Sequence, residues 1–270
     1  MRRFVSFVSA KGYLRRTGLL LDDHPMPSRS PLPQKVALVT GGSRGLGRLL
    51  ASFLSKQGYA VIITARVEAD LRDAAEELAA GGPVSAIPGD VTDVDHRRRL
   101  LDAAERWGRL DLLVNNASDL GDSPLPSLLW ASGETFRRVL DVNTLAPLAL
   151  IKEAFPLLAR SQGLVVNISS DAAVGGYPRW GVYGASKAAL DLMSKTLAAE
   201  LRDQGVAVVS VDPGDMRTTM HQDAYPGQDI SDRPLPDVTV PFWAWLFSQP
   251  RMAVSGMRYQ AQASLWEVPV

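Results

Sequence analysis

Cysteine is absent from the 270 residues, which excludes disulfide bonds, thiolate nucleophiles and cysteine metal sites. Histidine is scarce, and its three positions, His24, His96 and His221, are too scattered to predict a metal centre. Neither sign of charge is in excess: 29 basic residues balance 29 acidic ones, which gives no electrostatic case for binding nucleic acid or an acidic membrane surface. We also find no apolar run of the roughly 18 residues that a membrane span requires. The 46% hydrophobic content is enough for one large domain with a sizeable core, or at most two small ones.

Residues 1–33 differ in character from the rest of the chain, because they combine scattered basic residues with a turn-rich tract of prolines and serines. They lack the long apolar centre and small-residue cleavage site of a secretory signal. The arginines are compatible with an organelle transit peptide, but Asp22 and Asp23 argue against one. We expect a disordered extension, with Met26 as an alternative start, a folded domain at residues 34–270, and a cytoplasmic protein.

A strand, a glycine-rich loop and a helix follow in that order. Residues 35–40 are a short valine-rich run that predicts a strand, and the helical pattern after the loop ends at Gln57. Between them stands Thr40-Gly41-x-x-x-Gly45-x-Gly47, whose spacing does not fit G-x-G-x-x-G. Such glycines allow a tight turn and let helix N-terminal amides approach a phosphate. Nucleotide binding is the favoured interpretation, and a plain strand-to-helix connection is the alternative.

The end of the second strand bears on which nucleotide is bound. Residues 59–64 predict this strand, and an acidic side chain just after it would bond the adenosine ribose hydroxyls and repel a 2′-phosphate. Ala65 and Arg66 stand there instead, and Arg44 lies in the glycine loop. Two guanidinium groups suit a 2′-phosphate by charge and geometry. We therefore expect NADP(H) to be preferred, with NAD(H) as the alternative; both arginines could also be solvated loop charges.

Strands and helices alternate along the remainder of the chain. Further strands are predicted at 84–87, 110–114, 164–168, 206–211 and 256–261, and further helices at 68–80, 94–107, 133–160 and 181–203. This alternation predicts an α/β fold, a single-domain Rossmann-like doubly wound parallel sheet of about seven strands with helices on both faces. The loops then gather at one edge of the sheet, where open α/β folds bind ligands.

Asp90 follows the predicted strand 84–87 and precedes Val91. Its carboxylate could accept a hydrogen bond from an adenine amino group. It could equally cap the next helix, where Thr92 or Asp93 also suits the N-cap position. Both interpretations stay open.

The helical pattern of residues 133–160 contains Pro147. Proline has no N–H, so Pro147 cannot bond the carbonyl of Asn143, four residues earlier. That carbonyl is therefore free to bind a water molecule in the middle of a helix. A simple structural kink is the alternative.

Ser170, Tyr183 and Lys187 form the most suggestive group in the chain. Ser170 ends the predicted strand 164–168, and Tyr183 and Lys187 are four residues apart on the predicted helix, so they share one face. A neighbouring ammonium favours the phenolate, so we expect the pKa of Tyr183 to fall below its usual value of about 10. A serine hydroxyl could hold a carbonyl oxygen against that phenol. Taken alone, a Tyr-x-x-x-Lys pair often occurs by chance.

At this point the chain resembles the short-chain dehydrogenase/reductase family over residues 35 to about 220. The matching pieces, in the family's order and spacing, are Thr40-Gly41-x-x-x-Gly45-x-Gly47, Asp90-Val91, Asn115-Asn116-Ala117, Asn143, Ser170, Tyr183-x-x-x-Lys187 and Pro213-Gly214. Where the family has Asn-Asn-Ala-Gly, this chain has Ser118 in place of the glycine. The serine must either adopt the backbone conformation of that glycine, at some cost, or avoid it.

The resemblance implies a role for each matching residue. Tyr183 would be the general acid-base, and Lys187 would lower its pKa and bond the nicotinamide ribose. Ser170 would orient and polarise the substrate oxygen. The Asn143 carbonyl would hold a water in a proton relay to Lys187. The implied cofactor contacts are Gly41, Ser43, Arg44, Gly45, Leu46, Gly47, Arg66, Asp90, Val91, Asn115, Ala117, Tyr183, Lys187, Pro213, Gly214, Met216 and Thr218.

The substrate end is expected within residues 216–250, a polar, proline-stiffened loop that could act as a lid. The aromatic helix predicted at residues 241–247 more readily packs in the core or a subunit interface than binds substrate. Tyr177, Trp180 and Met220 suggest an apolar pocket, and no basic cluster marks a carboxylate or phosphate substrate.

The resemblance implies an NADP(H)-dependent oxidoreductase that acts on a small-molecule carbonyl or alcohol substrate, such as a carbonyl reductase. A non-catalytic NADPH-binding regulator and an epimerase or isomerase on the same fold are the alternatives. The resemblance also implies a homodimer or homotetramer, for which small residues on the predicted helix 181–203 would allow close packing.

Overall fold

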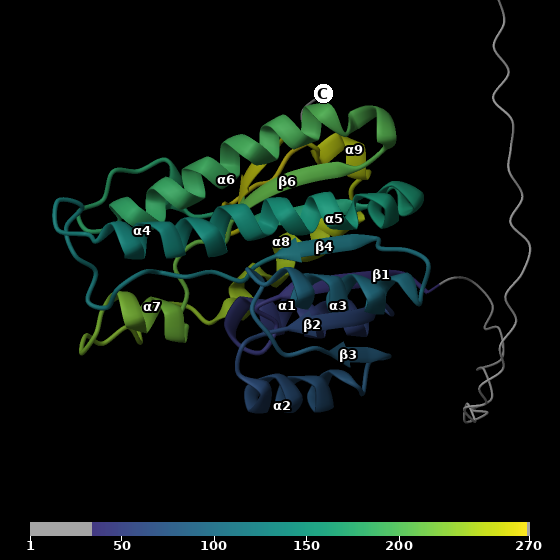
Figure 1. The fold of residues 1–270 in the computed structure, drawn as a ribbon, viewed down its shortest axis with the longest axis horizontal. Coiled ribbons are helices and arrows are strands. Elements are labelled where there is room, and N and C mark those ends of the chain that lie inside the picture. The colour runs from purple at the N-terminus through teal and green to yellow at the C-terminus, as the bar shows by residue number, and fades with distance from the viewer. Residues whose placement is uncertain (1–33, 269–270) are drawn as a thin grey trace, which may run out of the picture. The chain divides into compact units, whose positions relative to one another are not determined.

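A seven-stranded sheet forms the centre of the computed structural model, which describes residues 34–268 (Figure 1). The expectations for residues 1–33 lie outside the described residues. Every strand pair is parallel, and the spatial order is β3-β2-β1-β4-β5-β6-β7. The strands are β1 Val36–Thr40, β2 Ala60–Thr64, β3 Val84–Ala86, β4 Leu112–Asn115, β5 Leu164–Ile168, β6 Ala207–Asp212 and β7 Arg258–Gln260.

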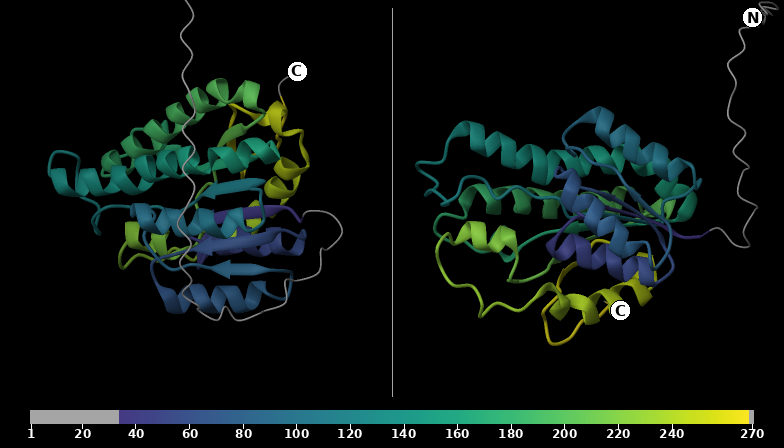
Figure 2. Two further views of the ribbon diagram at one scale, coloured as in Figure 1. Left: turned by 45° about the vertical axis from the view of Figure 1, so that its right-hand side comes forward. Right: turned by 90° about the horizontal axis from the view of Figure 1, so that it is seen from below.

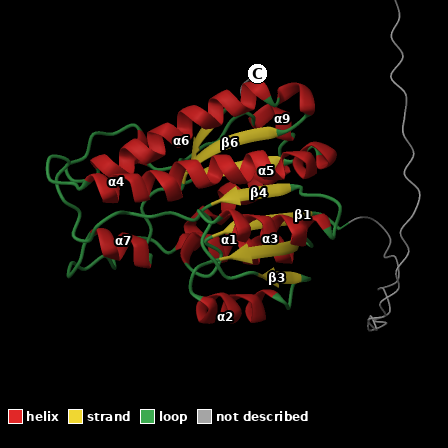
Figure 3. Cartoon of the chain, viewed as in Figure 1, coloured by secondary structure: helices red, strands yellow, loops and turns green. Residues whose placement is uncertain are grey.

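Helices cover both faces of this sheet (Figure 2). Successive residues of a strand point to opposite faces, so Val39 packs on one side of the sheet and Leu38 on the other. The Val39 side is covered by α1 Gly45–Lys56, α2 Glu68–Leu78, α8 Val240–Ser248 and α9 Arg251–Val254. The Leu38 side is covered by α3 Val94–Glu105, α5 Ala146–Ser161 and α6 Gly181–Glu200. The predicted doubly wound parallel fold is confirmed, and Figure 3 shows the yellow strands lying among the red helices.

The predicted helix 133–160 is confirmed as one continuous helical stretch, Gly133–Ser161, but it is not regular throughout. Helix α4, Gly133–Leu140, is followed by a π-helical segment, Asp141–Leu145, and then by α5. Pro147 stands in the first turn of α5, where a missing N–H is tolerated. The π-helical segment therefore includes Asn143, whose carbonyl Pro147 was expected to leave free. Such π-helical turns are frequent at functional sites.

By length and composition, the helical stretch Gly133–Ser161 is apolar enough to cross a membrane, although Lys152 and Glu153 interrupt its apolar run. Half of its apolar window is buried inside the fold. Leu150, Ile151 and Ala154 of α5 pack in the core against the sheet. A core helix needs the same apolar composition, and packing accounts for it here.

Residues 216–250 contain more regular structure than the predicted loop. A short helix, α7 Thr219–Ala224, begins at Thr218, whose side chain accepts a hydrogen bond from the His221 amide. The aromatic helix is α8, and Phe242 and Trp243 are fully buried in the core. The rings of α8 therefore support the fold, as expected.

Candidate active site

The site lies where the strand order reverses. Strand β1 pairs with β2 on one side and with β4 on the other. The chain leaves β1 toward β2 and leaves β4 toward β5, so the two connections separate at the carboxyl edge of the sheet. A cavity of about 620 Å³ opens there and is lined by residues that follow β1, β2, β4, β5 and β6. The predicted site residues that line it are Gly41, Ser43, Arg44, Gly45, Leu46, Gly47, Arg66, Asp90, Val91, Ala117, Ser170, Tyr183, Lys187, Pro213, Gly214, Met216 and Thr218. Residues predicted from scattered motifs therefore meet at one cavity.

The glycine loop between β1 and α1 is closed so tightly that side chains would not fit. Gly41 has a φ of +66°, and a Cβ on Gly47 would lie 2.1 Å from the Gly41 carbonyl oxygen. The Asn116 amide donates to the Thr40 carbonyl oxygen over 2.9 Å and holds the turn from the β4 side. Arg44 precedes α1 without a side-chain cap, so the first amides of α1 have no side-chain acceptor from that residue. The loop fits a phosphate group bound at a helix N-terminus.

The adenine end of the cavity carries Arg44, Arg66 and Asp90. Asp90 Oδ1 accepts hydrogen bonds from the amide and hydroxyl of Thr92, at 2.8 and 2.7 Å. Burial alone would raise the pKa of Asp90, but these bonds and the Arg66 charge outweigh it and lower that pKa. The N-cap of α3 is Asp93, whose carboxylate accepts from the Asp95 amide. Asp90 thus stabilises the turn before α3 and also lines the cavity, where its contact with an adenine stays a prediction.

Asn115 does not line the cavity, although its neighbours do. Its side chain is buried and donates to Asn167 Oδ1 over 2.8 Å, and Asn167 in turn donates to Ser194. The side chain of Asn115 therefore ties β4 to β5 and α6, while Asn116, absent from the predicted site residues, holds the glycine loop.

Ser170 follows β5 and opens a 3₁₀ turn, Asp171–Ala173. Its hydroxyl accepts from the Ala172 amide over 3.1 Å and donates to Asp171 Oδ1 over 3.0 Å. Its carbonyl oxygen accepts from Arg258 on β7 over 2.7 Å. The serine is therefore fixed from both its backbone and its side chain.

Tyr183 and Lys187 lie on the first half of α6, one turn apart. Lys187 is 1% exposed, and its ammonium donates to the Ile168 carbonyl oxygen over 2.8 Å. That ammonium is 5.5 Å from the centre of the Tyr183 ring, and Trp180 packs edge-on against the same ring. Lysine and tyrosine therefore face one region of the cavity, as their spacing predicts.

The expectation of a lowered tyrosine pKa is wrong for this structure. Burial raises the pKa of Tyr183 to about 12, and the nearby hydroxyls of Ser118 and Ser170 only partly oppose this. Burial also lowers the pKa of Lys187 to about 8. Desolvation disfavours both charged forms and here exceeds the effect of their proximity. Tyr183 therefore holds its proton at neutral pH.

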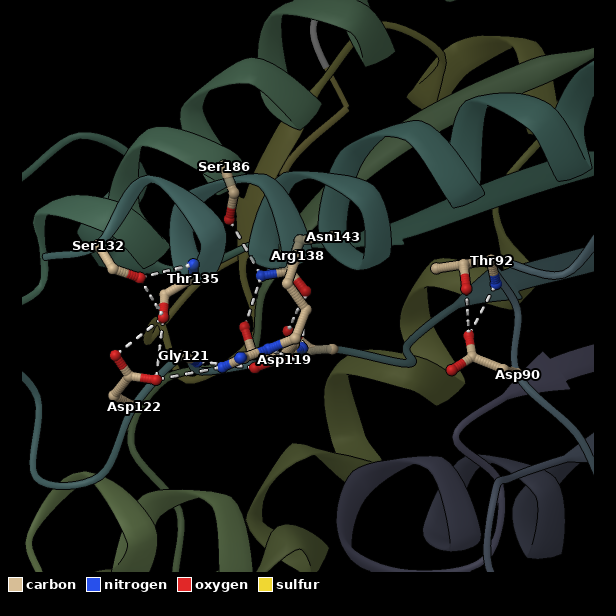
Figure 4. Close-up of polar contacts among 11 residues, drawn as sticks. Asp90, Thr92, Asp119, Gly121, Asp122, Ser132, Thr135, Arg138, Asn143 and Ser186 are labelled. Carbon is tan, nitrogen blue, oxygen red and sulfur yellow. Dashed lines mark hydrogen bonds and ion pairs between the residues drawn. The ribbon is translucent and has the colours of Figure 1, made fainter.

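Asn143 does not line the cavity but connects three segments around it (Figure 4). Its Oδ1 accepts from the Ser118 hydroxyl and the Asp119 amide, at 3.1 and 2.7 Å. Its Nδ2 donates to the Asp119 carbonyl oxygen and to Ser186 Oγ, at 2.8 and 3.0 Å. The Asn143 side chain thus joins the loop after β4 to α6, a role separate from that of its backbone carbonyl.

The substrate end mixes aromatic rings with carboxylates. Tyr177, Trp180 and Met220 line it as expected, together with Tyr225. Four aspartates also line the cavity near this end, so the wall is less apolar than the sequence suggested; they are Asp119, Asp171, Asp212 and Asp215.

Some residues of the site escaped the sequence analysis. Arg258 contacts Ser170 across 88 positions, and no local motif marks it. Asn116 belongs to the Asn115-Asn116-Ala117 motif. The contact of its side-chain amide with the glycine loop depends on the pairing of β1 with β4, which the sequence does not show.

A family model described as short chain dehydrogenase matches residues 35–229. The chain is 37% identical over 190 residues to an L-fucose dehydrogenase of Mus musculus, covering 70% of this chain and 68% of the relative. It is 32% identical over 193 residues to versicolorin reductase 1 of Dothistroma septosporum, covering 70% and 72%.

Solved structures show the same likeness. A short-chain dehydrogenase of Escherichia coli CFT073 complexed with NADPH aligns with a TM-score of 0.78 at 30% identity, covering 86% of this chain and 100% of the other. One from Shigella flexneri 2a complexed with NADP aligns with a TM-score of 0.78 at 30% identity, covering 85% and 97%.

Proposed function

Since this chain belongs to the short-chain dehydrogenase/reductase family and is an NAD(P)-dependent oxidoreductase, we propose that it prefers NADP(H) and acts on a carbonyl or alcohol substrate. The observation that carries this proposal is a single cavity that joins the glycine loop and its arginines to Ser170, Tyr183 and Lys187. The glycine loop supplies backbone amides for the pyrophosphate, and Arg44 and Arg66 supply charge for a 2′-phosphate.

Ser170 and Tyr183 would act on the substrate oxygen. A bound nicotinamide would supply the hydride in reduction, or accept it in oxidation. Tyr183 holds its proton because burial raises its pKa to about 12, so it suits the role of proton donor to the developing alkoxide. The Ser170 hydroxyl turns from Asp171 Oδ1 toward the substrate oxygen and polarises the carbonyl.

Lys187 would position the cofactor and return a proton to Tyr183. Its ammonium is anchored on the Ile168 carbonyl oxygen, which leaves two N–H groups for a ribose hydroxyl and a water. Because burial lowers the pKa of Lys187 to about 8, it can release a proton more readily than an ordinary lysine. The Asn143 carbonyl, freed by Pro147, would hold the connecting water.

A substrate panel tests the proposal. We expect NADPH to be oxidised with at least one ketone of a panel of aliphatic, aromatic and sugar carbonyls, and NADH more slowly. L-Fucose with NADP⁺ belongs in the panel, since one relative is named for it. The Tyr183→Phe variant is the matched control, because it keeps the ring and removes the proton.

Two outcomes would contradict the proposal in different ways. Tight NADPH binding without turnover of any member of the panel would indicate a non-catalytic regulator. Interconversion of substrate epimers without net change in nicotinamide absorbance would indicate an isomerase. The homodimer or homotetramer, the apolar substrate and the cytoplasmic location stay predictions.

A further inference from the structure

The four carboxylates that line the substrate end of the cavity differ in their counter-charges. Three of them are paired with arginines, at 3.1, 3.5 and 3.4 Å; the pairs are Asp119 with Arg138, Asp215 with Arg233 and Asp212 with Arg258. Asp171 forms no ion pair within residues 34–268, and its Oδ1 accepts from the Ser170 hydroxyl and the Ala172 amide. The charge of Asp171 is therefore uncompensated, directly beside Ser170.

The carboxylates make this end of the cavity unfavourable for a negative charge. Beyond burial, the charges of Asp212 and Asp171 both raise the pKa of Tyr183. Asp171 is also the main cause that raises the pKa of Tyr177. A phenolate is disfavoured at both positions, and a positive charge at the same place is favoured for the same reason.

Aromatic rings line the same end of the cavity. They belong to Tyr177, Trp180 and Tyr225, and the ring of Trp180 packs on those of Tyr183 and Tyr225, with centres 5.6 and 6.2 Å apart. The face of an aromatic ring attracts a cation, and its carbon surface suits an apolar group. These rings therefore suit a substrate that is mostly apolar and carries one positive charge.

His221 adds a nitrogen that no protein group uses. It lies on α7, lines the cavity and is 9% exposed, and its ring packs on Tyr225 with centres 5.1 Å apart. Its Nε2 is buried and has no hydrogen-bond partner within the described part of the chain. Asp215 Oδ1 lies 3.8 Å from Nδ1 and favours the proton on that nitrogen, which leaves a lone pair on Nε2. A ligand that donates an N–H group to Nε2 would satisfy it.

We propose that the substrate of this site carries a positively charged amino group on the carbon next to the reacting one, held by Asp171 and His221. The inference names a substrate class for the proposed oxidoreductase and rests on that proposed function. The amino group is bound and stays unchanged in the reaction. It would donate to the Asp171 carboxylate and to His221 Nε2, while the apolar part of the substrate lies against the aromatic rings.

The contact between Ser170 and Asp171 places the amino group next to the reacting carbon. Ser170 Oγ and Asp171 Oδ1 are 3.0 Å apart, a spacing that suits two polar atoms on neighbouring carbons. When the Ser170 hydroxyl turns to the substrate oxygen, Asp171 Oδ1 loses one of its donors. An ammonium group replaces that donor and also neutralises the carboxylate, which a neutral hydroxyl does not do.

Three alcohols of one skeleton isolate the effect of the charge. They are phenylethanol derivatives that carry an ammonium, a hydroxyl or a methyl group on the carbon next to the alcohol carbon. Each is oxidised with NADP⁺ at neutral pH while the absorbance of NADPH is followed. We expect kcat/KM for the ammonium compound to exceed that for the methyl compound by about tenfold or more, with the hydroxyl compound between them.

Variants assign this preference to the two side chains. Asp171→Asn keeps an Oδ1 acceptor for Ser170 and removes the charge, so it should reduce the preference for the ammonium compound about tenfold. His221→Phe keeps a ring against Tyr225 and removes Nε2, so it should reduce the preference as well. Asp122→Asn is the matched control and should keep the wild-type preference, because Asp122 pairs with Arg138 outside the cavity lining.

Binding to the NADPH complex, followed by NADPH fluorescence, tests the inference without turnover. We expect the ammonium compound to bind this complex more tightly than the methyl compound in the wild-type protein, and the difference to be lost in Asp171→Asn. If no compound is oxidised but this binding pattern is found, the proposed function is contradicted and the inference stands. The absence of both turnover and the binding difference would contradict both.

Other outcomes would overturn the inference alone. Oxidation of the ammonium and methyl compounds with equal kcat/KM would do so and leave the oxidoreductase function intact. A preference that survives Asp171→Asn would do the same, and so would a preference for the hydroxyl compound over the ammonium compound, since a neutral donor would then be enough. An unchanged preference in His221→Phe would overturn the contact with Nε2.

Discussion

Arg258 Nη2 donates a hydrogen bond to the carbonyl oxygen of Ser170 over 2.7 Å, although the two residues are 88 positions apart. The same guanidinium bonds Asp191 of α6 over 2.9 Å and lies 3.4 Å from Asp212 at the end of β6. Asp191 follows Lys187 by one helical turn and is the charge that opposes the lowering of its pKa. One arginine therefore holds together the segments that carry Ser170 and Lys187.

Loss of Arg258 should destabilise the protein. Asp191 and Asp212 are 11% and 5% exposed, so Arg258→Gln leaves two largely buried carboxylates without their counter-charge. We expect the free energy of unfolding in denaturant to fall by about 3–5 kcal/mol. Arg98→Gln is the control, because its pair with Asp95 is exposed and contributes little. Equal, small effects of both substitutions would contradict this account.

Tyr183→Phe should abolish turnover and leave cofactor binding intact. The phenyl ring keeps the packing against Trp180, while the proton for the substrate oxygen is lost. We expect a fall of at least about a hundredfold in kcat, with the dissociation constant of NADPH, followed by its fluorescence, nearly unchanged. Substantial activity in this variant would assign the acid-base role to another residue.

Arg44→Ala combined with Arg66→Ala should weaken NADPH far more than NADH. Each guanidinium lost from the 2′-phosphate is expected to cost roughly tenfold or more in affinity. Arg48→Ala is a matched control, since Arg48 lies on α1 but pairs with Glu77 and does not line the cavity. Binding titrations measure the ratio of the dissociation constants of NADPH and NADH. Equal losses of affinity for the two cofactors would refute the preference for NADP(H).

Pro147→Ala should restore a backbone donor to the Asn143 carbonyl and so compete with the proposed water. We expect a lower kcat with unchanged NADPH affinity, and no loss of helix stability, because alanine suits a helix better than proline. The comparison of kcat with thermal unfolding separates the two effects. If kcat stays at the wild-type value, the freed carbonyl is only a consequence of the kink.

His96 should make stability fall on mild acidification. It is fully buried under the loop after β3, its ring bonds Thr64 over 2.7 Å, and burial, with the nearby charge of Arg99, lowers its pKa. The unfolded chain takes up this proton at about pH 6.5 whereas the folded chain takes it up only at lower pH, so stability decreases as pH falls below about 6.5. Denaturant unfolding at several pH values checks this.

His96→Gln provides the comparison for this pH effect. The variant loses the titrating group, so the slope of its unfolding free energy between mildly acidic and neutral pH should be smaller than that of the wild-type protein. Identical slopes would show that other groups dominate this range.

The sequence by itself determined the elements and much of the chemistry. Alternating strands and helices specify a parallel sheet because parallel pairs need crossover connections. The glycine spacing after β1 and the one-turn spacing of Tyr183 and Lys187 are local facts, which a regular backbone converts directly into geometry. The fold class and the meeting of these residues at one edge follow from such patterns.

Only the tertiary structure decided what surrounds those residues. The packing of β4 against its neighbouring strands decides that Asn116, and not Asn115, faces the cavity. The position of the two residues in the sequence does not determine this. The pKa of Tyr183 rises because other segments bury it, whereas the sequence shows only the nearby Lys187. The bonds of Ser170 to Arg258 and of Ser118 to Asn143 join residues that are distant in the chain. Burial and such contacts arise from packing in space, so no spacing in the sequence encodes them.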